Sequence, residues 1–393
     1  MRVDEESGVS IVRRLAGIAP VVAAAAVLAC HDQPAPTSTK TVAPPPPPPL
    51  GAITRLTLPT PDGSTNILHP SVHCSSVACF MLACEHTTRD GHNGARSDIL
   101  ENTLGYQSAG TDMLSWTPVA NPIMSADEVD STTNLSDPEL LDLGSTLVAY
   151  QRLVPVGFDV LYMKETSDTV AWTPPREVLR TPANAAISPT VLQNADAYDL
   201  WVVDARPQGC MNPSTVTVRR RSRTYADFSA AAVDTTDLTV LRVGGMVPWH
   251  IEMIRGPADT PDSLILLVAM HPVGEECGKS SLYIGTSSDG LHFRINPGPV
   301  RTGAEPDAIF SMVYRSSGVY FAKNRTFTVL LSGLKTNADP GARLARIEYD
   351  YDSLLAATRE GRHPAPRRVI AEQFTNVSPR RSGQPQPPRV TPP

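Results

Sequence analysis

The stretch Glu165-Thr166-Ser167-Asp168-Thr169-Val170-Ala171-Trp172-Thr173-Pro174 decides the fold, because variants of it return along the chain. The variants are found at residues 110–118, 287–293 and, more weakly, 222–228. The aromatic residues that anchor these segments are 56, 56 and 65 residues apart: Trp116, Trp172, Phe228 and Phe293. Self-similarity at a long period is typical of repeat architectures. The sequence therefore predicts a fold built from repeated units.

A pair of short apolar runs precedes each copy. The clearest pair, residues 137–141 and 146–150, is joined by a turn at Gly144. Runs rich in β-branched and aromatic residues, bounded by turn residues, are typical of β-strands. Similar pairs occur at 69–72 with 79–82, 188–192 with 198–203, 250–254 with 264–268, and 319–321 with 326–331. Each repeating unit is therefore predicted to be a four-stranded β-meander.

Five such units predict an all-β fold that closes into a ring. A single meander exposes both of its faces, and neighbouring units bury those faces when they are arranged around a common axis. We therefore predict a five-bladed β-propeller over residues 52–377. Six blades is the alternative, which requires residues 52–58 and 367–374 to form more than one shared closing strand.

The N-terminal segment has the features of an export signal. Arg13 and Arg14 precede an apolar run at residues 15–29, which is shorter than a membrane span requires. The run ends Val-Leu-Ala-Cys, which resembles a bacterial lipobox and implies that Cys30 is lipidated. We expect residues 1–29 to be a lipoprotein signal peptide and the mature chain to be anchored in the bacterial cell envelope, at the outer membrane or the cell surface. An ordinary cleaved signal, with Cys30 incidental, is the alternative.

Proline-rich segments flank the predicted propeller. Six consecutive prolines at 44–49 favour an extended chain that does not pack, so residues 30–51 are expected to be a disordered tether. Residues 378–393 have a similar composition and are expected to be a disordered tail. The formal net charge of −6 offers no concentrated basic face, so the sequence does not predict nucleic acid as a partner.

The repeats also resemble a known family. Several first strands begin with an Asp-Pro-like pair, and the segment at 287–293 reads Ser-x-Asp-Gly-x-x-aromatic. In these features the chain resembles the five-bladed propellers of glycoside hydrolase family 43, of the arabinanase, xylosidase and invertase type, over most of residues 68–351. The same segment is similar to the aspartate box of six-bladed sialidases. The resemblance implies a central funnel that binds carbohydrate.

The resemblance implies three functional carboxylates where the first strands of blades one to three begin. The family places there a base Asp, a modulating Asp and an acid Glu, since glycoside hydrolysis needs two carboxyls across the scissile bond. This chain has His69, Asp137 and Ser188 at the three places, so only Asp137 matches. The catalytic set is therefore incomplete, and the family's mechanism does not carry over intact.

Other residues extend this candidate site. His250 holds the corresponding place in blade four, and Ser316 or Ser317 holds it in blade five. Glu139 and Glu252 lie two residues further along their strands, on the same face, and are the candidates to replace the missing carboxylates if the protein is an enzyme. The side chains expected to contact a ligand at the funnel are His69, Asp137, Ser188, Trp249, His250, Tyr314 and Arg315.

Five cysteines follow Cys30, and an oxidising envelope favours pairing among them. In the blade order that the resemblance implies, two polar loops at 206–214 and 271–280 share the funnel rim. We expect a disulfide between Cys210 and Cys277, which lie in these loops. Cys74 and Cys79 flank the first hairpin and are a second candidate pair; the pairing of Cys84 is left open.

Two other kinds of site receive less weight. His69, Asp137 and His250 form a possible two-histidine, one-carboxylate metal set, but no tight ligand spacing such as His-Glu-x-x-His occurs, so we expect no metal or other cofactor. A sialidase-like anion site would use strand-end arginines to hold a carboxylate, and the candidates are Arg152, Arg206, Arg255 and Arg315.

Two functions remain open at the level of sequence. The first is an envelope lipoprotein whose propeller binds glycan or a protein partner at its central funnel. The second is a divergent glycoside hydrolase that acts on extracellular polysaccharide. The incomplete carboxylate set favours binding, and whether the protein is an enzyme is left open, because propellers host both functions.

Overall fold

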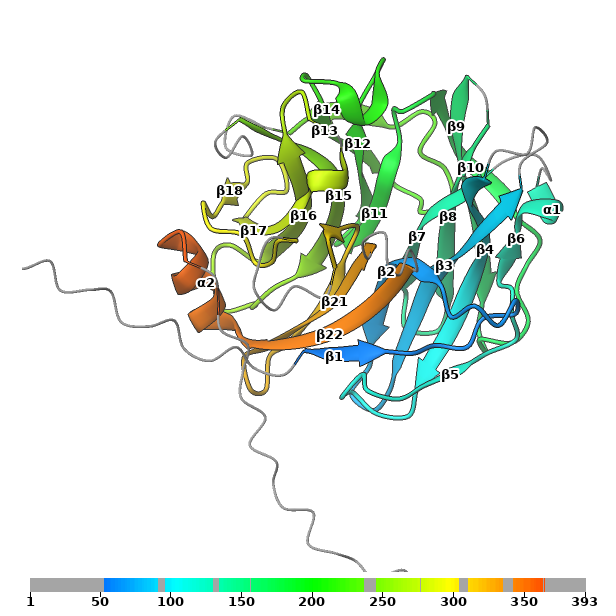
Figure 1. Ribbon diagram of the computed structural model, residues 1–393, viewed down its shortest axis with the longest axis horizontal. Helices are drawn as coiled ribbons and strands as arrows, with labels where there is room; N and C mark the ends of the chain where they lie inside the picture. The colour runs from blue at the N-terminus through cyan, green and yellow to red at the C-terminus, as the bar shows by residue number, and fades with distance from the viewer. Residues whose placement is uncertain are drawn as a thin grey trace, which may run out of the picture. The chain divides into compact units, whose positions relative to one another are not determined.

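The computed structural model describes residues 53–90, 96–129, 134–155, 157–236, 245–275, 277–303, 310–334, 342–362 and 364. The strands in these ranges form five antiparallel sheets of four or five strands. Figure 1 shows the sheets as blades in a ring, following one another in chain order. The predicted all-β, five-bladed propeller is therefore confirmed.

Each blade runs outward from the centre of the ring. The innermost strands are β2 (Ile67–Cys74), β7 (Asn134–Asp142), β11 (Ile187–Asn194), β15 (Met246–Arg255) and β20 (Ser317–Phe321). The second strands are β3 (Cys79–Asp90), β8 (Leu147–Val154), β12 (Ala197–Asp204), β16 (Leu264–Pro272) and β21 (Thr326–Leu334). The third strands are β4 (Arg96–Ser108), β9 (Phe158–Thr166), β13 (Val216–Ser222), β17 (Ser281–Ser287) and β22 (Ala342–Asp350).

The outer strands are β5 (Trp116–Pro118), β10 (Arg176–Pro182), β14 (Ala232–Thr235), β18 (Arg294–Ile295) and β1 (Thr54–Leu56). Two short strands add to this plan: β6 (Met124–Ser125) pairs with β4, and β19 (Met312–Val313) pairs with β21. The N-terminal strand β1 pairs with β22, so the first strand of the domain completes the last blade. Residues 54–56 therefore belong to blade five and do not form part of a sixth blade, while residues 367–374 lie outside the described residues.

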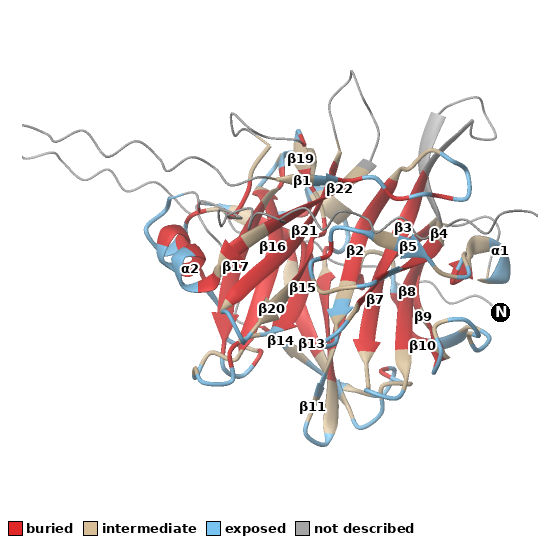
Figure 2. Cartoon of the chain, turned by 90° about the horizontal axis from the view of Figure 1, so that it is seen from below, coloured by how far each residue is buried: buried red, intermediate tan, exposed pale blue. Residues whose placement is uncertain are grey.

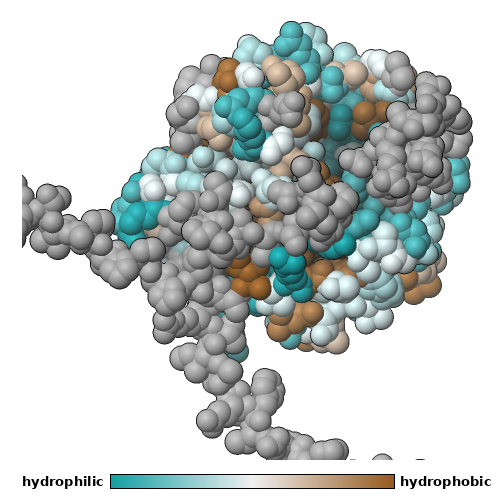
Figure 3. Space-filling view, in the orientation of Figure 1, coloured by the Kyte–Doolittle hydropathy of each residue, from teal (hydrophilic) through white to brown (hydrophobic). Residues whose placement is uncertain are grey.

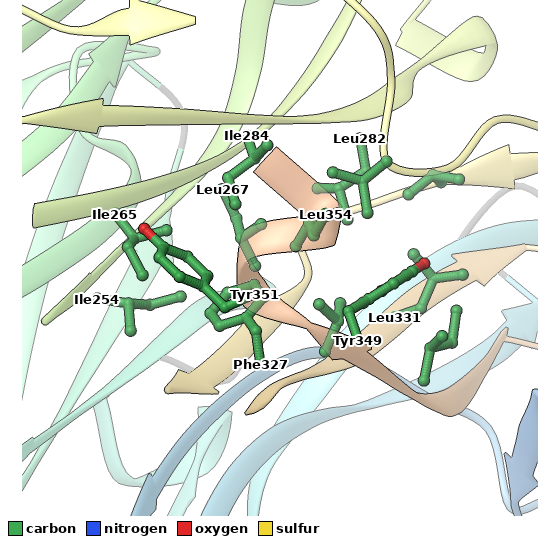
Figure 4. Packing of buried hydrophobic residues seen from close by; sticks show 14 of the residues in the cluster. Ile254, Ile265, Leu267, Leu282, Ile284, Phe327, Leu331, Tyr349, Tyr351 and Leu354 are labelled. Carbon is green, nitrogen blue, oxygen red and sulfur yellow. The ribbon is translucent and has the colours of Figure 1, made fainter. Parts of the chain in front are cut away.

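Apolar clusters fill the spaces between neighbouring blades. Between blades four and five, Ile254, Ile265 and Leu267 pack with Phe327 and Leu331 (Figure 4). Comparable clusters join blades three and four, two and three, five and one, and one and two. Figure 2 shows the resulting pattern of buried strands and exposed connections. Since burying one large apolar side chain contributes roughly 1.5–3 kcal/mol, these interfaces are what stabilise the closed ring.

The recurring turn has a structural role. In blade two the Asp168 carboxylate accepts hydrogen bonds from the amides of Val170 and Ala171, both at 2.9 Å. In blade four Asp289 accepts hydrogen bonds from the equivalent amides, those of Leu291 and His292. Gly290, which follows the aspartate, has φ +72°. The Gly290 carbonyl accepts from Trp201 Nε1 at 2.8 Å, which ties this turn to blade three. The segment that resembles an aspartate box is thus a packing element between blades.

The innermost strands begin with an unusual backbone. His69, Asp137 and Ser188 have φ values of +53°, +54° and +53°, and each precedes a proline. A register shift against the second strand follows at each of these places. Non-glycine residues seldom adopt the left-handed region, and such conformations cluster at functional sites. The three blades therefore share a bend in the first half of their inner strands, at the hub.

The cysteine predictions have mixed outcomes. A disulfide joins Cys74 to Cys79 across the β2–β3 hairpin, as the second candidate pair predicted. The expected disulfide between Cys210 and Cys277 is wrong, and Cys210 is a free thiol. Cys277 lies in the 3₁₀ turn η2 (Cys277–Lys279), and the end of this turn bonds to blade five through Ser280, whose amide donates to Cys277 O and whose hydroxyl donates to Val313 O. Cys210 lies in the turn η1 (Gly209–Met211), which closes on its own backbone in blade three.

Helices are few in this fold. Helix α1 (Ala126–Val129) is a single turn, and α2 (Tyr351–Arg359), which the sequence did not predict, packs Tyr351 and Leu354 onto the cluster between blades four and five. These two helices are the α-helices of the described residues, and neither has the length and hydropathy of a membrane span. Cys30 and the predicted signal, tether and tail lie outside the described residues.

Candidate functional site

The hub brings together three side chains from three blades. His69 lies in the first half of the inner strand of blade one, Asp137 in that of blade two, and His250 in that of blade four. Asp137 Oδ1 lies 3.3 Å from His69 Nδ1 and 3.3 Å from His250 Nδ1. All three residues are buried. The prediction that these residues share one pocket is therefore supported by their geometry, although they are distant in the sequence.

The arrangement fits a divalent metal ion. One ligand atom from each residue lies within 4.8 Å of the other two. Tetrahedral ligands at about 2.0–2.1 Å from zinc stand roughly 3.3–3.4 Å apart, which matches the distances from Asp137 Oδ1 to the two Nδ1 atoms, while the whole set of ligand atoms extends to 4.8 Å. Asp137 Oδ1 and both ring nitrogens of His250 are buried without a hydrogen-bond partner. Atoms of this kind are stabilised when a ligand meets them, so the metal set that received little weight in the sequence analysis is a candidate metal site in the folded chain.

The electrostatic environment keeps the donors in the form that binds metals. Burial lowers the pKa of His69 from 6.5 to about 3, and burial also lowers the pKa of His250, so both rings are neutral at pH 7. Burial by itself raises the pKa of Asp137, but His69, His250 and Arg152 together outweigh it and hold this pKa well below its usual value. The site thus offers a carboxylate and two neutral imidazoles.

Arg152 holds the Asp137 carboxylate through its second oxygen, Oδ2. Its Nη1 donates to Asp137 Oδ2 at 3.2 Å and its Nη2 to Asp159 Oδ1 at 3.0 Å. Asp159 in turn accepts from the amide of Ala186 in blade three. Because both terminal nitrogens are engaged, Arg152 orients Asp137, and the prediction that it receives a ligand carboxylate is wrong for this residue.

Aromatic rings surround the histidines. The Tyr314 ring stacks on His69 with centroids 5.4 Å apart and is tilted against His250 at 5.1 Å. Trp249 meets His250 edge-on at 5.4 Å. The predicted contacts Trp249 and Tyr314 therefore do flank the hub. His271, which meets Trp249 at 6.4 Å, was not among the predicted site residues.

Ser188 has a different part from the one predicted. Its hydroxyl donates to Ile251 O at 3.0 Å and accepts from Ile251 N at 3.1 Å. These two bonds tie blade three to blade four immediately after His250. The predicted ligand contact at Ser188 is thus occupied by the backbone of the next blade.

A second layer lies one step deeper in the hub and contains Arg315, Glu139 and Glu252. Arg315 Nη2 donates to Glu139 Oε2 and to Glu252 Oε2, both at 2.6 Å. The same guanidinium donates to the backbone carbonyls of Pro138 at 2.6 Å and Pro189 at 3.0 Å. This network connects blades two, three, four and five across the axis.

The second layer corrects three predictions. Arg315 is fully buried with its terminal nitrogens engaged, so it is neither a funnel contact nor an anion site. Burial and the neighbouring Glu252 raise the pKa of Glu139 well above 4.5, and burial also raises that of Glu252. Their carboxylate oxygens are bonded to Ser71, Thr190, Ser317 and Arg315. The two glutamates therefore form part of the structural hub and do not replace the missing catalytic carboxylates.

The other predicted anion-binding arginines lie away from the hub. Arg206 is exposed and pairs with Asp204 in the same segment. Arg255 lines a cavity of about 560 Å³ at the opposite ends of the inner strands, and donates to Asn194 Oδ1 at 3.1 Å. His73 and Asp142, paired at 2.9 Å, lie at this same opposite end. Both arginines are therefore bonded to residues outside the hub.

Sequence reasoning missed His271 and the bracing role of Arg152. The alternation along β8 places Arg152 on the same face as Tyr150, but nothing local indicates that its partner is Asp137, 15 residues earlier. His271 lies near the end of β16, after seven apolar residues, and its proximity to Trp249 depends on the pairing of Val247 with His271. Both contacts depend on the register between neighbouring strands, and the sequence repeats define that register only approximately.

No protein-family model and no curated protein sequence matches the chain. Among solved structures, it is similar to an N-acetylgalactosamine deacetylase from F. plautii in complex with blood group B trisaccharide, with a TM-score of 0.63 and 16% identity over 78% of this chain and 97% of that chain. It is also similar to RS223-β-xylosidase (TM-score 0.52, 8% identity, 77% and 95% coverage). A family 43 enzyme from Xanthomonas citri complexed with xylose is comparable (TM-score 0.52, 9% identity, 77% and 92% coverage). The chain therefore has the five-bladed β-propeller fold of the glycoside hydrolase family 43 enzymes.

Proposed function

We propose that the hub binds a divalent metal through His69, Asp137 and His250, and that the protein hydrolyses an acyl group, such as an N-acetyl group, on a glycan. The observation that carries this proposal is the position of Asp137 Oδ1, 3.3 Å from both Nδ1 atoms and without a hydrogen-bond partner. A metal ion at such a site polarises a carbonyl oxygen and lowers the pKa of water. The fold neighbour with a TM-score of 0.63 is a deacetylase of an N-acetylated sugar, which supports the same class of reaction.

The chain's own residues have defined tasks in this proposal. Asp137 is ionised at neutral pH and supplies negative charge at the hub. Arg152 fixes the plane of that carboxylate through Oδ2 and leaves Oδ1 for the metal. Tyr314 and Trp249 confine the imidazoles from the sides, which restricts the ring orientations. Preorganised ligands of this kind are what metal sites require.

The structure gives little support to a glycosidase of the two-carboxylate type. Such hydrolysis needs an acid and a base or nucleophile about 5–10 Å apart around the glycosidic bond. Of the three family positions only Asp137 is a carboxylate, and it is held by Arg152. Glu139 and Glu252 are bound to Arg315 in the layer below. Hydrolysis of an acyl group needs no second carboxylate of this kind.

Metal binding and turnover test the proposal together. We expect purified protein to bind about one Zn²⁺ or Mn²⁺ per chain in calorimetry and to release acetate from N-acetylgalactosamine glycosides. Asp137→Asn should abolish both. Asp142→Asn, at the opposite end of the same strand, is the matched control and should change neither. Wild-type protein that binds neither metal overturns the proposal.

The second candidate function is glycan binding without turnover. The aromatic rings around the hub favour it, because sugar rings pack well on aromatic faces. On the face shown in Figure 3, the apolar side chains of the described residues lie in small separate patches among hydrophilic ones, which favours a glycan over an apolar protein surface as ligand. Binding on a glycan array with no acetate or sugar released would support this candidate over the enzyme.

We propose further that the propeller is displayed from the bacterial envelope by lipid at Cys30. The lipobox-like residues 27–30 carry this proposal, and the Cys74–Cys79 disulfide supports an oxidising compartment. Cys30→Ser is expected to move the protein from the membrane fraction to the soluble fraction. Unchanged membrane attachment of this variant would exclude lipidation at that residue.

A further inference from the structure

Blade four carries two unpartnered ring nitrogens beside the hub. Trp249 Nε1 and His271 Nε2 are both buried and have no hydrogen-bond partner. His271 is 1% exposed. The Trp249 ring lies edge-on to His250 at 5.4 Å and edge-on to His271 at 6.4 Å, so the tryptophan stands between the hub and the second histidine.

A β-bulge puts Trp249 in this place. In the β15–β16 ladder Pro248 pairs with Met270 and His250 pairs with Ala269, so Trp249 is the extra residue between two pairs. Bulges redirect side chains and are frequent beside functional sites. His271 pairs with Val247 just before the bulge, which brings its ring to the same end of the blade. Both side chains thus owe their position to one irregularity of the sheet.

The two nitrogens have opposite hydrogen-bonding characters. An indole Nε1 only donates. His271 Nδ1 lies 3.1 Å from the carbonyl of Pro272, which only accepts, so Nδ1 carries the ring proton and Nε2 is left as an acceptor. Burial lowers the pKa of His271 below 6.5, which keeps the ring neutral at pH 7. Next to the hub there is therefore one donor and one acceptor.

We propose that Trp249 and His271 form a subsite that recognises the hydroxyl groups of the sugar whose acyl group lies at the hub. This inference rests on the proposed function and adds the source of its substrate selectivity. Sugar hydroxyls both accept and donate, which matches an indole N–H and an imidazole acceptor. A site built to bond a hydroxyl rejects an analogue without it, because its own polar atoms are then left unpaired.

Monodeoxy sugars test the subsite. The probes are a nitrophenyl N-acetylgalactosaminide and its analogues that lack one hydroxyl each, with acetate release as the readout. Wild type is expected to lose ten- to hundredfold in kcat/KM with one or two of the analogues. Trp249→Phe, which removes the indole N–H together with the five-membered ring, and His271→Phe should raise KM for the full sugar about tenfold and lose this selectivity. His271→Gln, which restores an acceptor, should recover part of it.

Trp172→Phe is the matched control, because Trp172 Nε1 is also unpartnered but its ring packs on Phe80 in another blade. It should leave KM and selectivity unchanged. The subsite is overturned if Trp249→Phe and His271→Phe, folded as judged by an unchanged Tm, keep the wild-type ranking of the deoxy analogues. Failure of the proposed function is a separate result, since it would show as wild type that neither binds Zn²⁺ nor releases acetate from any probe.

Discussion

The two oxygens of the Asp137 carboxylate have different surroundings. Oδ2 accepts from Arg152, whereas Oδ1 faces the two Nδ1 atoms of His69 and His250. His69 Nδ1 accepts from the amide of Asp137 at 3.4 Å, so the ring proton of the neutral His69 belongs on Nε2, which has no hydrogen-bond partner. Asp137 Oδ1 and both ring nitrogens of His250 are also without a partner, and a cation at the hub would satisfy such atoms without burying a protonated ring.

The low pKa of His69 predicts a loss of stability in acid. Burial lowers this pKa from 6.5 to about 3, so between these values the folded state binds fewer protons than the unfolded state. The contribution to stability is complete above about pH 6.5 and is lost as the pH falls toward 3. In EDTA, the Tm of wild type should therefore fall more steeply from pH 7 to pH 4 than that of His69→Asn. Parallel curves would contradict this assignment.

Arg315 predicts a larger effect on folding. Arg315→Met leaves Glu139 and Glu252 buried without their counter-charge, and breaking a buried ion pair on one side costs about 3–5 kcal/mol. Urea unfolding should show this loss, and the triple variant with Glu139→Gln and Glu252→Gln should recover much of it. Arg255→Met, at an exposed site, should change stability by less than about 0.5 kcal/mol. A triple variant no more stable than Arg315→Met would refute the charge argument.

At the scale of single elements, the turn between the third and outer strands is the most regular feature. Its aspartate accepts from the amides two and three residues later in blades two and four. The residue after the aspartate is in the left-handed region in blades one, two and four: Met113, Thr169 and Gly290. Only Gly290 is also crowded, since a Cβ there would lie 2.7 Å from Trp201 Cζ2. The glycine therefore serves the packing of blade three as well as the turn.

This crowding predicts that Gly290→Ala lowers the free energy of unfolding more than the same substitution at Gly144. Gly144 has φ +84° and nothing within 4 Å of an added Cβ, so Gly144→Ala should cost only the conformational penalty, about 1 kcal/mol. Gly290→Ala adds the collision with Trp201 and should cost about 1–3 kcal/mol more. Denaturant midpoints of the two variants make the comparison. Equal midpoints would mean that the Trp201 ring moves away without loss.

The elements were largely predictable because their signals are local. Apolar runs, turn residues and recurring aromatic residues located all five inner strands and the hairpin disulfide Cys74–Cys79. The exceptions depend on tertiary contacts. Helix α2 is stabilised by burying Tyr351 and Leu354 against blades four and five, and the turn that holds Cys277 bonds toward blade five instead of toward Cys210. Neither contact produces a periodic pattern in the sequence from which it could be predicted.

For the whole molecule, ring geometry decides what reaches the centre. The repeats placed His69, Asp137 and His250 correctly on inner strands, and the fold then brought them together. They did not show that Arg315 enters the layer below, because one residue of register where the chain enters β20 decides whether a side chain faces the hub or the blade interface. Long-range charge pairing, such as Arg315 with Glu139, 176 residues earlier, settles that register only in the closed ring.

Closure of the ring predicts that the three residues of β1 matter far more than their number suggests. Thr54–Leu56 pair with β22, and Leu56 and Leu58 are buried between blades five and one. A chain that begins at residue 59 loses both leucines and exposes the edge of β22, so it should be less stable by roughly 3–6 kcal/mol, at 1.5–3 kcal/mol for each leucine. A chain that begins at residue 51 keeps β1 and should match the full-length protein in Tm. If the shorter chain unfolds at the same temperature, the blades hold together without β1, and the hub residues of blades one and five would then be positioned by the inner-strand contacts of β2 and β20 alone.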